Sequence, residues 1–305
     1  MSPDQSASSS TVEELAVGVP GGELAVLRWP AAEPDAPVVL ALHGITANGL
    51  AWELVARELA GRVTLLAPDL RGRAGSAGLG GPYGMDRHAD DAALVLRQLA
   101  GGAGKVAVAG HSMGAFVTTR LAVRHPELVR RVVLVDGGVG FPLPAGTSTE
   151  ALAELLGPAL ARLSMTFADM AAYRAFWRAH PAWSSLDEAA AEGYLVRDLT
   201  GQEPRLRSAC VREAVEADGG QLLSDPQAAA AVRQLPCPAE LLWAERGLLD
   251  DPQGVYDEQR LAAAGLAGLD LTLRQIKDSN HYSILMGQVG APLVAERILA
   301  AAGLG

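Results

Sequence analysis

The sequence predicts an α/β fold in which a mostly parallel sheet has helices on both faces and carries a helical insertion. Short apolar runs alternate with amphipathic segments of helical length along the first half of the chain. Strands that are buried on both faces of a parallel sheet have this composition. A long stretch without strand patterning separates these runs from two more. The 305 residues are enough for one domain of this kind with its insertion.

The N-terminal part of the chain predicts a tail followed by an antiparallel hairpin. Residues 1–11 are polar, and we expect a flexible tail there. Over residues 13–29, apolar and polar residues alternate on both sides of Pro20-Gly21-Gly22. This pattern is typical of two strands joined by a tight turn.

The next part of the chain predicts four buried strands with helices between them. We expect helices at about 49–60, 85–100 and 113–124. The strands are the apolar runs "VVLALHG", "VTLLAPD", "KVAVAGHS" and "RVVLVDGG". Continuous apolar strands that alternate with helices indicate a parallel sheet covered on both faces.

Residues 141–235 predict a helical cap inserted into a core formed by residues 12–140 and 236–305. The inserted stretch shows no strand pattern and is rich in Ala, Glu, Arg and aromatic residues. The runs "AELLWAE" and "LDLTLRQI" predict two further strands, with a helix at about 255–264 between them. The last amphipathic segment, "APLVAERILAAAG", predicts a helix that ends at Gly303.

Composition and charge argue against several classes of function. A net charge of −10 is unfavourable for binding to nucleic acid or to an anionic membrane surface, both of which attract basic patches. No run of 18 apolar residues occurs and the N-terminus has no signal-peptide pattern, so we expect a cytoplasmic protein. Cys210 and Cys237 lack the spacing of a metal or redox site, and we expect no metal. The choice between a monomer and a dimer stays open.

The segment "VAVAGHSMGAFVTTRLAV" contains the strongest chemical signal in the chain. Within it, Gly110-His111-Ser112-Met113-Gly114 joins a buried strand to a helix. A sharp turn at such a junction holds the serine in a strained conformation, and flanking glycines avoid collision with the neighbouring turn. The hydroxyl then lies at a helix N-terminus, where negative charge is favoured. Ser112 is therefore the predicted nucleophile, and a structural serine at a helix cap is the alternative.

A serine hydroxyl needs a base that removes its proton and N–H donors that bind the oxyanion. Among the six histidines, only His281, in "KDSNHYSILMG", lies just past the last predicted strand. It is therefore expected at the sheet edge that carries Ser112, although an ordinary loop histidine is the alternative. Backbone N–H groups of Met113 and of Ile45, in "LHGITANG", are the expected oxyanion donors.

These motifs resemble those of serine hydrolases with the α/β-hydrolase fold, a superfamily of esterases, lipases and C–C hydrolases. The resemblance extends from Val38 to the end of the chain and rests on "LHG", "PDLRG", "GHSMG", "HPELVRRVVLVD" and "NHYSILMG" in this order. It implies an eight-stranded sheet with a helical cap over the pocket at 141–235. It also implies a nucleophile at Ser112, a base at His281 and oxyanion donors at Ile45 and Met113.

Two segments depart from the pattern of this superfamily. The usual "DLRGHGxS" reads "DLRGRAGS", with Arg73 at the fifth position. The usual "WGxxD" reads "WAERG", which puts Gly247 where the acid that orients the histidine is common. Asp250 or Asp251 can reach that place through a longer loop, or Asp136 can act from the end of the sixth strand. We prefer Asp136, because a strand end fixes position more firmly than a loop, and keep Asp250 as runner-up.

The predicted function is hydrolysis of a carboxylic ester through an acyl-enzyme, without a metal or organic cofactor. Many of the aromatic residues lie in the predicted cap, so the expected substrate is a moderately hydrophobic small molecule. We expect His43, Trp177, Trp183 and Tyr282 to line the pocket. The same serine would also serve a C–C bond, lactone or thioester hydrolase or a cofactor-free perhydrolase. A non-catalytic ligand receptor with this fold is a further alternative.

Overall fold

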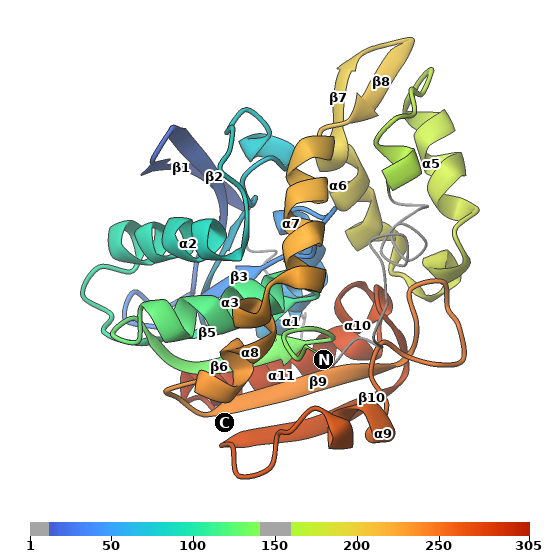
Figure 1. Cartoon of the computed structure of the whole chain (residues 1–305). Helices are drawn as coiled ribbons and strands as arrows, with labels where there is room; N and C mark the ends of the chain where they lie inside the picture. Colours follow the sequence, from blue (N-terminus) through green and yellow to red (C-terminus); the bar gives the residue numbers. More distant parts are fainter. Residues whose placement is uncertain (1–11, 141–159) are drawn as a thin grey trace, which may run out of the picture.

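The computed structural model describes residues 12–140 and 160–305 and contains an eight-stranded sheet (Figure 1). In their order across the sheet, the strands are β1 (Glu13–Val19), β2 (Gly22–Trp29), β4 (Thr64–Pro68), β3 (Val38–Leu42), β5 (Val106–His111), β6 (Val129–Val135), β9 (Ala239–Arg246) and β10 (Leu271–Asn280). β1 and β2 form the predicted antiparallel hairpin, and β2 is antiparallel to β4. All other neighbours are parallel, which confirms the mostly parallel α/β fold.

Helices cover both faces of the sheet because most strands are apolar on both sides. One face is covered by α2 (Met85–Leu99), α3 (Met113–Arg124) and α9 (Glu258–Ala263), and the other by α1 (Glu53–Leu59), α10 (Ser283–Met286) and α11 (Gly290–Ala302). Successive residues of one strand serve the two sides: Val132 packs with α2 and α3, and Val133 packs with α1 and α11. Side chains alternate across a strand, and the core is therefore divided in two.

Single residues determine where one helix begins and where another ends. The predicted helix at 49–60 begins as a 3-10 turn, Gly49–Trp52, because the Asn48 side chain accepts a hydrogen bond from the N–H of Leu50. The C-terminal helix ends at Gly303, whose φ of 87° is in the left-handed region that glycine adopts readily.

The segment between β6 and β9 is described over residues 160–235, which we call the insertion. It contains α5 (Met170–Arg178), a 3-10 turn (Pro181–Ser185), α6 (Glu188–Asp198), β7 (Leu199–Gln202), β8 (Arg205–Ser208), α7 (Arg212–Ser224), α8 (Pro226–Ala230) and a second 3-10 turn (Ala231–Gln234). β7 and β8 pair as an antiparallel hairpin, so the prediction of an insertion without strands is wrong. Four-residue strands are too short to show a clear period. The expected tail, 1–11, and the first part of the expected cap, 141–159, lie outside the described residues.

The C-terminal ends of the parallel strands lie at one edge of the sheet. The chain leaves this edge at Gly44, Ser112, Asp136, Gly247 and His281. Open α/β sheets bind their ligands at this edge. The fold therefore brings together residues that are more than 200 positions apart in the chain.

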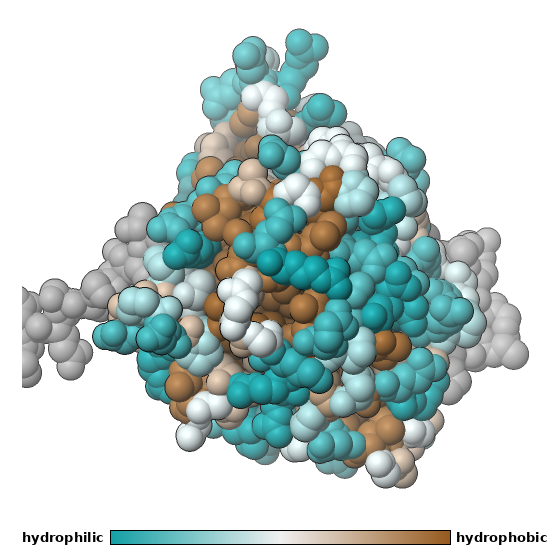
Figure 2. All heavy atoms as spheres, turned by 90° about the vertical axis from the view of Figure 1, so that its left-hand side faces the viewer, coloured by the Kyte–Doolittle hydropathy of each residue, from teal (hydrophilic) through white to brown (hydrophobic). Residues whose placement is uncertain are grey.

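The face that carries β1, β2 and α2, on the left of Figure 1, is mostly hydrophilic. Hydrophobic residues gather in a hollow near its centre (Figure 2). Of the helices in the described ranges, none has the length and apolar character that crossing a membrane requires.

Candidate active site

Ser112 lies between β5 and α3 in a backbone conformation that few residues adopt. Its φ is 53° and its ψ is −122°, a combination that is strained for a residue with a side chain. The turn requires glycine on both sides. A Cβ atom on Gly110 would lie 2.3 Å from the carbonyl oxygen of Gly114, and one on Gly114 would lie 2.2 Å from that of Leu42. The hydroxyl is thus held at the N-terminus of α3, where helix amides favour negative charge.

His281 follows β10 and contacts a buried carboxylate. Its Nδ1 hydrogen-bonds to Oδ2 of Asp136 at 2.6 Å, so in the neutral ring Nδ1 carries the proton and Nε2 has the lone pair. The Asp136 side chain is fully buried, and its Oδ1 accepts a hydrogen bond of 3.0 Å from the N–H of Ala244. A Cβ atom on Gly137 would lie 2.2 Å from the carbonyl oxygen of Ser112. The end of β6 therefore lies against both the serine turn and the histidine.

The loop after β9 directs its carboxylate elsewhere. Oδ1 of Asp250 accepts hydrogen bonds from Nε of Arg246 at 2.7 Å and from Nδ2 of Asn280 at 2.9 Å. Arg246, together with Asn280, holds the pKa of Asp250 below its usual range. A Cβ atom on Gly247 would lie 2.8 Å from the carbonyl oxygen of Gln253, so a longer side chain there would force the loop to move. The carboxylate in contact with His281 is that of Asp136.

The two expected oxyanion donors lie on chain segments that meet at Ser112. Gly44 approaches the serine closely, since a Cβ atom there would lie 3.3 Å from Cβ of Ser112. Ile45 follows and is buried. Met113 is the first residue of α3, and the first N–H groups of a helix have no acceptor inside it. The chain segments that carry both N–H groups therefore lie next to Ser112.

His43 does not line the pocket, contrary to the expectation from the sequence. It is fully buried beneath the loop that follows β3. Its Nδ1 donates to the carbonyl oxygen of Gly44 at 2.8 Å, and its Nε2 accepts from the N–H of Leu70 at 2.8 Å. Burial lowers the pKa of His43 to about 3. Both ring nitrogens are used in holding the backbone, and none is left for a ligand.

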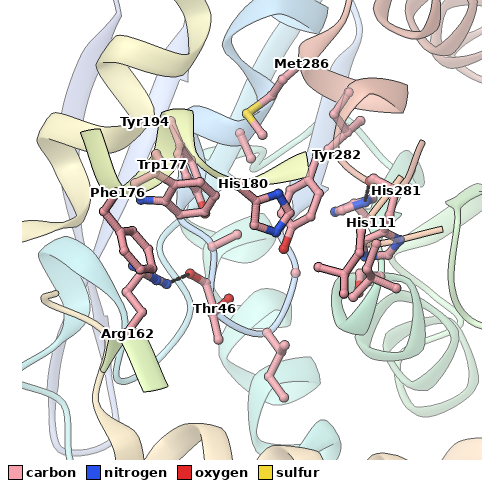
Figure 3. Close-up of a pocket in the computed structure, with 18 residues that line it drawn as sticks. Thr46, His111, Arg162, Phe176, Trp177, His180, Tyr194, His281, Tyr282 and Met286 are labelled. Carbon is pink, nitrogen blue, oxygen red and sulfur yellow. Dashed lines mark hydrogen bonds between the residues drawn. The ribbon is translucent and has the colours of Figure 1, made fainter. Parts of the chain in front are cut away.

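Ser112 and His281 line one cavity of about 90 Å³ between the core and the insertion. In Figure 3, Phe176, Trp177 and Tyr194 lie on one side, His111 and His281 lie on the other, and His180 and Tyr282 lie between them. The lining is completed by small and aliphatic residues and two polar ones: Gly44, Ile45, Thr46, Ala47, Ala51, Arg162, Leu248, Leu249, Leu285 and Met286. The cavity is thus mainly apolar, with the polar groups of the serine and histidine at one end.

Of the four residues expected in the pocket, Trp177 and Tyr282 are part of its lining, and Trp183 is not. Trp183 is half-buried in the 3-10 turn Pro181–Ser185 and packs against the hydrophobic core on the α1 and α11 side. The sequence gives no sign of this packing.

His111 lies beside His281, and its ring is hydrogen-bonded to the backbone of His281. Its Nε2 donates to the carbonyl oxygen of His281 at 2.8 Å, and the two ring centres are 4.7 Å apart. Burial lowers the pKa of His111 well below its usual value, and the neighbouring His281 lowers it further. His111 is therefore neutral at physiological pH and fixes the position of the chain at His281.

Arg162 is a pocket residue that the sequence did not point to. Its guanidinium group is buried, donates to the carbonyl oxygen of Thr46 at 3.1 Å and lies 5.3 Å from the ring centre of Trp177 (Figure 3). It also forms an ion pair with Asp198. Nothing in the local pattern around residue 162 distinguishes it from the many exposed arginines of this chain.

Cys210 is buried, Cys237 is half-buried, and both are free thiols. Burial raises the pKa of Cys210 to about 11. Over residues 12–140 and 160–305, no three His, Cys, Asp or Glu side chains are grouped so that they could hold a metal ion.

Comparison with known proteins identifies the family of this fold and site. The model of the alpha/beta hydrolase family matches residues 38–295. The chain belongs to this family. Among its curated relatives, this alpha/beta hydrolase is 38% identical over 100 residues to 2-(acetamidomethylene)succinate hydrolase of Mesorhizobium japonicum, a match that covers 33% of this chain and 35% of the relative. It is 39% identical over 119 residues to an esterase of Mycobacterium tuberculosis, covering 39% of this chain and 38% of the relative.

The matched segments thus span little more than a third of these relatives, whose activities are not carried over by the match alone. Solved structures match this alpha/beta hydrolase over nearly its whole length. E-2-(acetamidomethylene)succinate hydrolase has a TM-score of 0.77 at 24% identity, with 96% of this chain and 100% of that chain covered. The thioesterase domain from the curacin biosynthetic pathway has a TM-score of 0.73 at 22% identity, with 95% and 99% covered. At these identities the likeness shows the fold.

Proposed function

We propose that this alpha/beta hydrolase cleaves a carboxylic ester of a small, moderately hydrophobic molecule through an acyl-enzyme formed on Ser112. The observation that supports this most is the hydrogen bond between His281 and Asp136 beside a serine held in a strained turn. This is the arrangement that activates a hydroxyl nucleophile. All three residues lie at the ends of parallel strands, next to a mainly apolar cavity.

In the proposed reaction, Oγ of Ser112 attacks the ester carbonyl carbon while Nε2 of His281 takes the hydroxyl proton. The negative charge that develops on the carbonyl oxygen is bound by the N–H groups of Ile45 and Met113. His281 then gives its proton to the leaving alkoxide oxygen, and the alcohol departs. Water repeats the sequence on the acyl-enzyme and releases the acid, and Asp136 stabilises the imidazolium ion in both halves.

The lining of the cavity supports a neutral acyl or alkyl group as the bound part of the substrate. Phe176, Trp177 and Tyr194 of the insertion form one wall, and we propose that the insertion acts as a cap. Among the described residues, Arg162 is the one arginine in the lining, and its positive charge is paired with the carboxylate of Asp198. The pair offers little net charge to a substrate.

The test is labelling and turnover with matched serine variants. A fluorophosphonate should label the wild-type protein and Ser224→Ala, whose serine is exposed at the end of α7, but not Ser112→Ala. Hydrolysis of p-nitrophenyl butyrate should fall by about 10⁶ in kcat for Ser112→Ala alone. Full activity of Ser112→Ala would sink the proposal. A panel of lactones, thioesters and vinylogous diketones shows which acyl bond is cleaved best, and a wild-type protein that neither labels nor turns over would favour a receptor.

A further inference from the structure

The loop Gly44–Ala47, which we call the oxyanion loop, is held by hydrogen bonds to three successive carbonyl groups. The carbonyl of Gly44 accepts from Nδ1 of His43 at 2.8 Å. The next two accept from buried arginines: Ile45 from Nε of Arg73 at 3.0 Å, and Thr46 from Nη2 of Arg162 at 3.1 Å. A peptide unit is planar and joins the carbonyl of one residue to the N–H of the next, so the contact with His43 fixes the Ile45 N–H, and the contacts with Arg73 and Arg162 fix the two peptide units that follow it. The orientation of this loop thus depends on side chains outside it.

Arg73 connects the oxyanion loop to α7 of the insertion. Its side chain is fully buried, and Nη1 lies 2.5 Å from Oδ2 of Asp218, which is also fully buried. The same carboxylate contacts Nε2 of His88 at 2.9 Å. Burial alone would raise the pKa of Asp218, but His88 and Arg73 outweigh it and hold the pKa below its usual range. Asp218 is therefore a carboxylate that pairs with Arg73 from the other side of the boundary between core and insertion.

Arg162 connects the same loop to α6 and to the hairpin of the insertion. Its Nη1 pairs with Asp198, the last residue of α6, and contacts the hydroxyls of Tyr173 at 2.8 Å and Ser208 at 3.2 Å. Burial would lower the pKa of Arg162, but Asp198 outweighs it and the pKa is raised. Figure 3 shows the hydrogen bond from this guanidinium group to Thr46 at the cavity. Arg162 is thus charged, buried and fixed at several points.

Two features make these contacts stronger than ordinary loop hydrogen bonds. Hydrogen bonds from a charged donor are shorter and stronger than neutral ones, and a guanidinium group presents its donors in a rigid plane. Breaking one partner of a buried ion pair leaves an uncompensated charge, which is strongly unfavourable. Arg73 and Arg162 therefore keep their positions only while Asp218 and Asp198 are in place. Both carboxylates belong to the insertion, as does Arg162, whereas Arg73 belongs to the core.

We propose that Arg73 and Arg162 are positioning residues for the oxyanion hole, because they hold the two peptide units that directly follow the Ile45 N–H. Asp218 and Asp198 then make the placement of this N–H depend on the insertion being seated on the core. The proposal rests on the proposed serine hydrolase function. Neither arginine touches the reacting atoms in this reaction. Each acts through a carbonyl group of the oxyanion loop, so that seating the insertion both covers the cavity and completes the donor set.

Arg197 provides a matched control within the same boundary. It lies in α6, is largely buried and joins the insertion to the core, with Nε 2.8 Å from Oδ2 of Asp69 and Nη1 2.7 Å from Oε2 of Glu14. Its hydrogen bonds do not reach the oxyanion loop. Arg197→Lys therefore makes the same change of side chain at an ion pair between insertion and core, without any change at the oxyanion loop.

The experiment compares Arg73→Lys, Arg162→Lys and Arg197→Lys in the full chain. Lysine keeps the charge beside each carboxylate but cannot serve the carbonyl and the carboxylate in the same geometry. For hydrolysis of p-nitrophenyl butyrate, kcat should fall by about 10- to 100-fold in the first two variants, with KM changed by less than about threefold. Arg197→Lys should stay within about threefold of wild type in both constants.

A second readout reports the oxyanion hole directly. Oγ of Ser112 adds to the carbonyl carbon of an alkyl trifluoromethyl ketone. The hydroxyl proton passes to His281, and the ketone oxygen becomes an oxyanion. The matching trifluoromethyl carbinol fills the same space and forms no oxyanion. The ratio of the two affinities should drop by the same factor as kcat in Arg73→Lys and Arg162→Lys. It should stay at the wild-type value in Arg197→Lys.

The outcomes separate this inference from the proposed function. If wild-type protein is not labelled by a fluorophosphonate, both are overturned. If it is labelled and active, but the affinity ratio is unchanged in Arg73→Lys and Arg162→Lys or falls equally in Arg197→Lys, only the positioning role is overturned. Thermal unfolding of each variant shows whether it is folded. Where a lysine variant is unfolded, the double variant Arg73→Gln/Asp218→Asn or Arg162→Gln/Asp198→Asn, which removes both charges of the pair, takes its place with the same expected drop in the affinity ratio.

Discussion

Replacing Asp136 by asparagine changes the group that faces His281 while keeping its size. In the native protein, Oδ2 accepts from Nδ1 of His281 at 2.6 Å and Oδ1 accepts from the N–H of Ala244 at 3.0 Å. Asparagine has one acceptor and one donor for these two places. The N–H of Ala244 can be satisfied only by the amide oxygen, so the amide NH₂ faces His281. It then donates to Nδ1, and the ring proton must lie on Nε2.

His281 in this tautomer has no lone pair on Nε2 and cannot take the proton of Ser112. A wrong tautomer in a hydrogen-bonded serine–histidine–carboxylate site lowers kcat by about 10⁴, or about 5.5 kcal/mol of transition-state stabilisation. Stability should change little by comparison, because the volume and the bond to Ala244 are kept. Asp136→Asn is therefore expected to be folded and nearly inactive.

The assay is steady-state hydrolysis of p-nitrophenyl butyrate, with folded protein quantified by thermal unfolding. Asp250→Asn is the matched control, because Asp250 binds Arg246 and Asn280 at a partly exposed site. We expect its kcat to stay within about fivefold of wild type, since losses at exposed ion pairs are small. The assignment of the acid to Asp136 is wrong if Asp250→Asn loses as much activity, or if Asp136→Asn keeps more than about a tenth of it.

Two further predictions concern Gly247 and His43. Gly247→Asp, which restores the common position of the acid, should not rescue Asp136→Asn, because a Cβ atom at residue 247 would lie 2.8 Å from the carbonyl oxygen of Gln253; recovery of kcat in the double variant would contradict this. The pKa of His43 is lowered by burial from about 6.5 in the unfolded chain to about 3, so its contribution to stability is complete above pH 6.5 and is lost as the pH falls toward 3. Below pH 6.5 the slope is about 1.4 kcal/mol per pH unit, so the free energy of unfolding should drop by about 2 kcal/mol by pH 5. His43→Gln should remove this part of the drop in urea titrations, and an unchanged pH dependence would show that His43 is not its source.

Much of the fold could be predicted because the core strands carry a local signal. A run such as "KVAVAGHS" is apolar on both faces, and the hairpin at 13–29 alternates around a glycine turn. The hairpin of β7 and β8 could not be predicted in the same way. Its strands have four residues each, and Leu206 is placed by a bridge to Phe167, which is 39 positions away (206 − 167 = 39).

Residues of the candidate site could be predicted from the sequence only where they directly follow a strand, because the strand end then fixes their position. Ser112 and His281 follow β5 and β10, and parallel strands bring such ends to one edge. Their catalytic roles stay predictions. His43 also follows a strand, but whether its ring points into the pocket or under the loop depends on Leu70, a partner 27 positions away. A sequence pattern does not encode that direction.

Buried ion pairs are the part of the site that a single sequence hides most completely. Arg162 and Asp198 are 36 positions apart, and each would be read as a solvated surface charge from its neighbours in the chain. Burial of such a pair is decided by tertiary packing alone, because each partner is costly to bury without the other. The same holds for Arg73 and Asp218, even though Arg73 stands in a segment that departs from the family pattern.

The two carboxylates at the end of β6 and in the loop after β9 contact different residues around the His281 position. Asp136 contacts the ring, whereas Asp250 binds the side chain of Asn280, the residue before His281. The carbonyl of Gly247 also lies 3.5 Å from the backbone N–H of His281. The loop after β9 therefore steadies the backbone of the histidine while β6 orients its imidazole. Because Asp136 at the end of β6 contacts the ring, the loop after β9 does not have to turn a carboxylate toward the cavity, and it places Leu249 in the lining instead.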